Sequence, residues 1–192
     1  MNASRVYDFV FRGLLTDEAL DKAGRRSAVF TDATTDDLRA ALSLELLDPD
    51  QLASAVQMGI VYSAIASFEN SARRFVSKVL ADQHGDGWWS SNVSEKIRIM
   101  AESRQEEEAK TRWHGRRGDS PINYTELGDL ARIIQQNWDD FEPHIRRVDW
   151  ANSIFASVER SRNVIMHSGV LDIEDVERLG INIRDWVKQV GS

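Results

Sequence analysis

Apolar residues recur every three or four positions along most of this chain, a spacing that places them on one face of a helix. The longest series lies within residues 49–83 and alternates steps of four and three: Val61, Ile65, Phe68, Ala72, Phe75 and Val79. Asp48 and Pro49 precede it as a cap and a first-turn proline, and Gly85 and Gly87 follow it. The pattern predicts one long helix with a buried face.

The same spacing predicts further helices over residues 93–110, 125–137, 150–167 and 172–190. In the helix at 125–137 the inward residues would be Leu127, Leu130, Ile133 and Ile134. Few stretches alternate apolar and polar residues as half-buried strands do. The pattern therefore favours an all-α fold.

The first 48 residues carry a weaker pattern. Two short helices are expected at residues 4–15 and 16–23, with Thr16 as a cap and Gly24 as a stop. A third helix would start at Thr35, with three leucines spaced four apart behind it: Leu38, Leu42 and Leu46. We expect a helical extension at 1–48 and a main helical domain at 49–192, together forming one compact unit.

Composition limits the classes of function. The chain of 192 residues is 42% hydrophobic and 29% charged, which is typical of a globular domain. It has no cysteine, no run as long as a membrane span and no signal-peptide pattern at its start, so a cytoplasmic protein without membrane contact is expected. The net charge of −7 means that any contact with nucleic acid must come from a local basic patch.

Residues 160–169 carry the chemistry that remains after other motifs are excluded. The four histidines show no zinc-type pairing, and no phosphate-binding loop is present, so neither a metal nor a cofactor is expected. In this stretch Arg162 supplies a fixed cation and His167 a group that titrates near neutral pH. Asn163 and His167, four apart, share a helix face, and Gly169 stands just past the helix end.

These residues resemble a known family. Arg162 to His167 is similar to the Arg-x(4–6)-His motif of the HEPN superfamily, in which a polar residue such as Asn163 often follows the arginine. Glu69 and Arg73 resemble the acidic-plus-arginine signature of an earlier HEPN helix. Residues 121–138 resemble one subgroup, which includes the HEPN domain of a eukaryotic nuclear transcript-surveillance endoribonuclease and bacterial proteins linked to defence. The resemblance covers about residues 57–190.

The resemblance implies a HEPN-type antiparallel bundle, with a core around Phe68, Phe75, Ile133, Ile154 and Ile165. It also implies a metal-independent endoribonuclease in which the 2′-hydroxyl of RNA attacks the adjacent phosphate and leaves a 2′,3′-cyclic phosphate. The active form would be a homodimer, and the biological role that of a toxin or an antiviral defence effector. An antitoxin or another partner protein would fit such a role.

Each residue has an alternative role. Arg162 is either catalytic or a salt-bridge partner of Glu69, and His167 is either catalytic or a helix C-cap. Arg160 also satisfies the motif at a longer spacing. Asn163 would orient His167 or the substrate, while Glu69 and Arg73 would hold Arg162 in place. A polar loop either contacts RNA or is an ordinary exposed loop; its candidate residues are Arg112, His114, Arg116 and Arg117.

Two other classes of function stay open from the sequence. One is a non-catalytic HEPN module that binds RNA or a nucleotide. The other is a helical protein-interaction domain, which the acidic balance favours mildly. The run Glu106 to Glu108 is interpreted as a solvated face, and most of the six tryptophans as packing residues.

Overall fold

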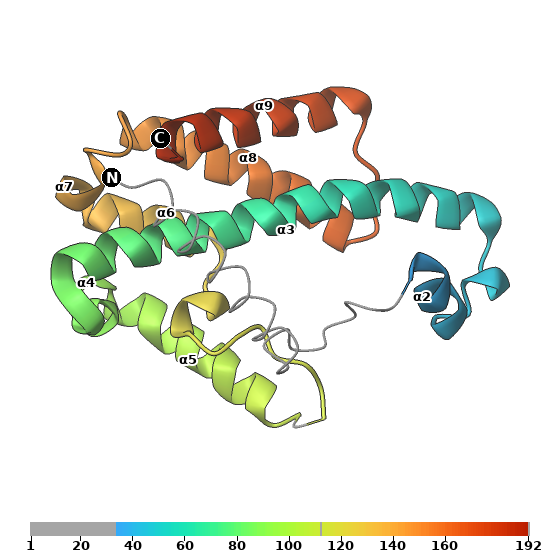
Figure 1. Ribbon diagram of the computed structural model, residues 1–192, viewed down its shortest axis with the longest axis horizontal. Coiled ribbons are helices and arrows are strands. Elements are labelled where there is room, and N and C mark those ends of the chain that lie inside the picture. Colours follow the sequence, from blue (N-terminus) through green and yellow to red (C-terminus); the bar gives the residue numbers. More distant parts are fainter. Residues whose placement is uncertain (1–33, 112, 192) are drawn as a thin grey trace, which may run out of the picture. The chain divides into compact units, whose positions relative to one another are not determined.

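The computed structural model describes residues 34–111 and 113–191, and within these ranges every regular element is a helix (Figure 1). Its contacts divide the chain into two units, Met1–Leu52 and Ala53–Ser192. The expected helices at 4–15 and 16–23 lie outside the described residues. The prediction of an all-α fold is confirmed, whereas the predicted boundary at residue 48 stays a prediction.

In the first unit, helix α2 spans Thr35–Ala41 and a 3₁₀ turn, η1, spans Leu44–Leu46. Thr34 caps α2 through a capping box with Asp37. The helix starts at Thr35 as predicted but ends at Ala41, so Leu42 and Leu46 lie beyond it. Their side chains are 67% and 80% exposed.

The remaining elements follow in chain order. They are α3 (Pro49–His84), η2 (Gly85–Gly87), α4 (Trp88–Asn92), α5 (Glu95–Ala109), η3 (Pro121–Tyr124), α6 (Leu127–Gln136), α7 (Trp138–Phe141), α8 (Val148–Met166) and α9 (Ile173–Val190). The helix expected at 125–137 begins later, because Glu126 and Asp129 form a capping box at its start. All four residues expected to point inward from α6 are buried.

Helix α3 forms where its local signals predict it. The Asp48 carboxylate accepts hydrogen bonds from the backbone N–H groups of Asp50 and Gln51, at 3.1 and 2.9 Å. At the other end Gly85 adopts a positive φ of 69°, which stops the helix. The buried residues of α3 comprise most of the predicted stripe and three further residues: Met58, Ile65, Phe68, Ala72, Val76, Val79 and Leu80.

Helices α3, α8 and α9 alternate in direction. The ring centroids of Phe68 on α3 and Phe155 on α8 lie 5.8 Å apart. Seven residues later on α3, the ring of Phe75 lies 5.9 Å from that of His144, which precedes α8, so the two helices run in opposite directions. Helix α8 packs against both α6 and α9, so it is the central helix of this unit (Figure 1). This antiparallel arrangement agrees with the expected bundle.

The core centres on Trp186 of α9, which is fully buried. Its ring lies 5.7 Å from Phe68, 5.6 Å from Phe75 and 5.0 Å from Phe155, and it stacks on Trp150 at 6.0 Å. Of the five residues expected in the core, Phe68, Ile133 and Ile154 are buried. The other two, Phe75 and Ile165, are only partly buried and pack against the core from its edge.

The first turns of α3 are apolar yet exposed. No charged side chain occurs from Gln51 to Phe68, and Val56, Ile60 and Tyr62 are exposed. Among the described residues, the stretch Pro49–Asn92 alone is long and apolar enough to cross a membrane, although the sequence suggested no such run. One such helix is weak evidence for a membrane span, since buried core helices of soluble proteins pass the same test, although only 17% of this apolar window is buried.

We predict that Trp186→Ala lowers the free energy of unfolding by about 3–5 kcal/mol, because it empties the centre of the aromatic cluster. Denaturant unfolding followed by circular dichroism measures this loss. Trp113→Ala is the matched control, since Trp113 is 85% exposed and its removal should change stability by no more than about 0.5 kcal/mol. Equal losses in the two variants would show that Trp186 is not the centre of the core.

Candidate functional site

Helix α8 ends in a backbone arrangement that fixes His167 at the helix terminus. The N–H of Gly169 donates to the carbonyl of Val164 at 2.8 Å, and the N–H of Ser168 donates to that of Ile165 at 3.0 Å. These two bonds form a Schellman motif. Gly169 stands past the helix end as predicted, but Ser168 is the residue with a positive φ, 61°.

Gly169 is needed for a different reason. A Cβ added at this position would lie 2.9 Å from the carbonyl oxygen of Val164, which is closer than real Cβ atoms come. The glycine therefore permits the chain to turn back tightly over the last turn of α8. That turn sets the position of His167.

The Glu69 carboxylate on α3 joins two arginines. Its Oε1 lies 3.1 Å from Nε of Arg162 on α8, and its Oε2 lies 3.3 Å from Nη2 of Arg73 on α3. The Glu69 side chain is only 12% exposed. A carboxylate so buried is stable when its charge is paired, and here two guanidinium groups pair with it.

Arg73 extends this network to the start of α6. Its Nη2 donates to the carbonyl oxygen of Thr125 at 3.0 Å, and its Nη1 donates to Oδ1 of Asn70 at 3.2 Å. Arg73 thus links α3 to the segment between η3 and α6. The predicted structural role of Glu69 and Arg73 has a geometric basis in these contacts, and their part in catalysis stays a prediction.

Arg162 retains donors for a substrate. Its Nε pairs with Glu69, and its terminal nitrogens have no hydrogen bond or ion pair within the described ranges. The side chain is 34% exposed. The salt-bridge role and the catalytic role are therefore compatible, because one edge of the guanidinium is anchored and the other can face an anion.

His167 and Asn163 are exposed, and the only bond between them is a backbone one. The N–H of His167 donates to the carbonyl of Asn163 at 3.2 Å. Neither side chain makes a hydrogen bond to another residue in the described part of the chain. Arg160 is also exposed and, unlike Arg162, has no ion pair there. Arg162 is thus the one of the two motif arginines that the fold holds in place.

Two other histidines lie far from His167. His144 precedes the start of α8, whereas His167 follows its end, and a helix of 19 residues is about 28 Å long. His84 pairs with Asp140 at 2.7 Å, near the same end of α3 as the contact between Phe75 and His144. Neither histidine can share a proton-transfer site with His167 within one chain. In the described residues no group of histidine and acidic side chains could hold a metal ion.

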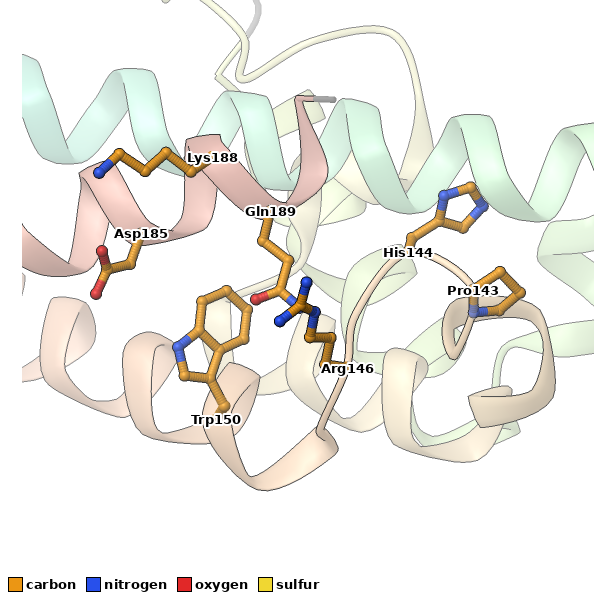
Figure 2. A pocket seen from close by; sticks show the side chains of 7 residues that line it. All are labelled: Pro143, His144, Arg146, Trp150, Asp185, Lys188 and Gln189. Atoms are coloured by element: carbon orange, nitrogen blue, oxygen red, sulfur yellow. The ribbon is translucent and has the colours of Figure 1, made fainter.

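A polar pocket of about 450 Å³ lies at that distant end of α8 (Figure 2). Figure 2 shows Arg146, Trp150 and Gln189 close together, with Asp185 and Lys188 on the neighbouring turn of α9. Trp150 lines this pocket and also stacks on the buried Trp186. The acidic Asp185 beside the cations makes the pocket a poor match for a polyanion.

The polar loop expected to contact RNA is partly engaged by the protein itself. Arg117 donates its N–H to Oε2 of Glu108 at 3.0 Å, and its Nε lies 3.4 Å from Oε1. The Tyr124 hydroxyl donates to the same Oε2 at 2.7 Å. Glu108 is therefore not simply part of a solvated acidic face, as its sequence context suggested. His114 and Arg116 are exposed, and Arg112 lies outside the described residues.

The contact between Glu108 and Tyr124 shifts both pKa values. The donated hydroxyl, and then the Arg117 N–H, lower the pKa of Glu108. The hydrogen bond to the carboxylate raises the pKa of Tyr124. A lowered carboxyl pKa stabilises the fold at neutral pH, and this contribution is lost as pH falls through the lowered value. The raised phenol pKa keeps the hydroxyl protonated well into the alkaline range.

We predict that one tyrosine titrates above the ordinary pKa of phenol, and that Glu108→Gln returns it toward that value. Phenolate absorbance in the ultraviolet, followed over an alkaline pH series, measures the shift. Tyr124→Phe is the control, because it should remove the late-titrating group altogether. Tyrosines that titrate identically in wild type and Glu108→Gln would contradict the contact.

One of three comparisons with known proteins identifies a family for this chain. A family model described as Swt1-like HEPN matches residues 63–191, about two thirds of the chain. The match includes Glu69, Arg73, Arg162 and His167, and it leaves out the exposed start of α3. No curated protein and no solved structure matches the chain. The predicted resemblance is confirmed, and the chain belongs to the Swt1-like HEPN family.

Proposed function

We propose that this protein is a metal-independent endoribonuclease. Membership of a HEPN family is compatible with an RNase or another RNA-related function. The observation that supports cleavage is the arrangement at the end of α8. Glu69 anchors Arg162 through one edge of its guanidinium, and the exposed His167 follows five residues later at the helix terminus.

These two groups suit cleavage through the 2′-hydroxyl of RNA. His167 in its neutral form accepts the proton of the 2′-hydroxyl, whose oxygen attacks the adjacent phosphorus. The bond to the 5′-oxygen breaks, and that oxygen takes a proton from an imidazolium. Arg162 stabilises the negative charge that builds on the phosphoryl oxygens. The products are a 2′,3′-cyclic phosphate and a 5′-hydroxyl.

The reaction needs a proton acceptor and a proton donor, and His84 and His144 lie at the other end of α8. A homodimer with its axis near His167 would supply both. Exposed apolar side chains surround the same region and would be covered by such a contact: Val164, Met166, Val170 and Ile173. The exposed start of α3 adjoins it, because the Leu171 N–H donates to Sδ of Met58 at 3.4 Å.

The exposed apolar side chains also support a second candidate function, a helical protein-interaction domain. An antitoxin or another partner protein would then occupy this surface. A toxin or antiviral role is part of the proposal and follows from the resemblance alone. A cytoplasmic location is also proposed, because a chain without cysteine suits a reducing compartment. A non-catalytic HEPN module that binds RNA or a nucleotide is the remaining alternative.

We predict that the protein cleaves single-stranded RNA in excess chelator, and that Arg162→Ala and His167→Ala each lower the rate by roughly 100- to 10,000-fold. Cleavage of a fluorescent oligonucleotide measures the rate. Arg160→Ala is the matched control, because Arg160 is an exposed arginine of the same helix without an ion pair among the described residues. Full activity of His167→Ala, or activity that returns only with magnesium, would refute the mechanism.

We further predict that the active species is a dimer with a shared site. Mixing Arg162→Ala with His167→Ala should restore a small part of the activity, because the mixed dimer combines one arginine and one histidine from different chains, which neither parent dimer does. The rate should stay well below that of wild type, because only one of the two histidines remains to transfer protons. Light scattering under assay conditions gives the oligomeric state. A fully active monomer would refute the shared site.

A further inference from the structure

A basic groove runs along α3 from the Glu69 network. It has a volume of about 620 Å³ and lies between the middle turns of α3 and the segment that contains η3. Its cations are Arg73, Arg74 and Lys78, and no acidic side chain lines it. In a chain with a net charge of −7, three cations without an acid mark a local site for an anion.

Two of the three cations of the groove are available to bind an anion. Arg74 and Lys78 are exposed and have no ion pair within the described ranges. Arg73 is already paired with Glu69 and bonded to Thr125 and Asn70, so the cations available to a ligand are Arg74 and Lys78. Polar groups that can bind phosphate oxygens also line the groove, together with the apolar Ala81 and Ile122: Asn70, Ser77, Ser120 and Asn123.

The wall opposite α3 is held in position before any ligand arrives. Arg73 binds the carbonyl of Thr125, and the Tyr124 hydroxyl binds Glu108. Gly118 has a φ of 152°, and a Cβ there would lie 1.9 Å from Nδ2 of Asn123. The absence of a side chain at Gly118 therefore lets Asn123 take its place in the groove wall. A preformed site binds its ligand with little cost in ordering.

The groove is continuous with the candidate cleavage site through shared side chains. Arg73 lines the groove and pairs with Glu69, and Glu69 also pairs with Arg162. A polyanion that reaches the terminal nitrogens of Arg162 could thus continue along α3 toward Lys78. The exposed loop at 113–117 is a weaker candidate for binding a polyanion, because its Arg117 already pairs with Glu108.

We propose that this groove binds the sugar–phosphate backbone of the RNA strand on one side of the scissile phosphate, with Arg74 and Lys78 as its main phosphate contacts. The inference rests on the proposed ribonuclease function and names the surface that grips its substrate. RNA would bind mainly to α3 and the segment of η3, and cleavage would occur at the end of α8. These contacts are to the backbone and not to base edges, so affinity should depend only weakly on the RNA sequence.

The test uses a single-stranded RNA oligonucleotide with every 2′-hydroxyl methylated, which can bind but cannot be cleaved. Fluorescence anisotropy gives its affinity over a series of salt concentrations. In the double variant Arg74→Ala, Lys78→Ala we expect the affinity to fall roughly tenfold to a hundredfold. The slope of log affinity against log salt should decrease by about 1.4, or about 0.7 for each phosphate contact to a single strand.

The matched control is Lys96→Ala, Arg184→Ala, which removes two exposed cations that do not line the groove. It should change the affinity and the salt slope little. With a cleavable strand, the groove variant should raise KM and keep kcat. An affinity, salt slope and KM equal to those of the control variant would overturn the groove while leaving the proposed nuclease intact. Weakened binding by the groove variant, with no cleavage by wild type, would support the groove and sink the nuclease.

Discussion

One carboxylate shared by two guanidinium groups determines where the candidate site lies. Glu69 is almost buried between α3 and α8, and a charge in that position is costly unless it is paired. Arg73 pairs with it from the same helix, and Arg162 pairs with it from the other. The buried charge of Glu69 is stable only while guanidinium groups pair with it. The ion pair between Glu69 and Arg162 therefore fixes the last turns of α8 against α3. The Schellman turn at Ser168 and Gly169 then fixes His167 relative to Arg162.

The two halves of α8 have different structural roles. Its first half is anchored by aromatic packing, since Trp150 and Phe155 both contact the buried ring of Trp186. Its second half carries the polar network, and its last turn is exposed. A rigid start and an exposed end suit a helix that presents reactive groups at its terminus. The exposed apolar residues at that end are what a second copy of the chain would cover.

The sequence predicts most of this fold, because caps and periodic apolar faces are local signals. Asp48 at the start of α3 and Asp172 at the start of α9 cap their helices, and most of the stripe of α3 is buried as expected. Features that depend on contacts between residues distant in the sequence could not be predicted from these local signals. The central position of Trp186 depends on two other helices, α3 and α8, and the hydrogen bond from Arg73 ends on a backbone carbonyl, that of Thr125. Glu108 appeared to belong to a solvated run because its partner Tyr124 is 16 residues away. The motif residues could be named from the family resemblance, but the anchoring of Arg162 rather than Arg160 needed the structure.

A double-mutant cycle between Glu69 and Arg162 tests this pairing most directly. The free energies of unfolding of Glu69→Ala, Arg162→Ala and the double variant are compared with that of wild type. Residues in one ion-pair network typically show an interaction free energy of about 0.5–3 kcal/mol. We expect a value in this range for Glu69 with Arg162, and additivity for Glu69 with the exposed Arg160. Additive losses for Glu69 and Arg162 would contradict the account, because they would mean that the carboxylate does not hold this arginine in place.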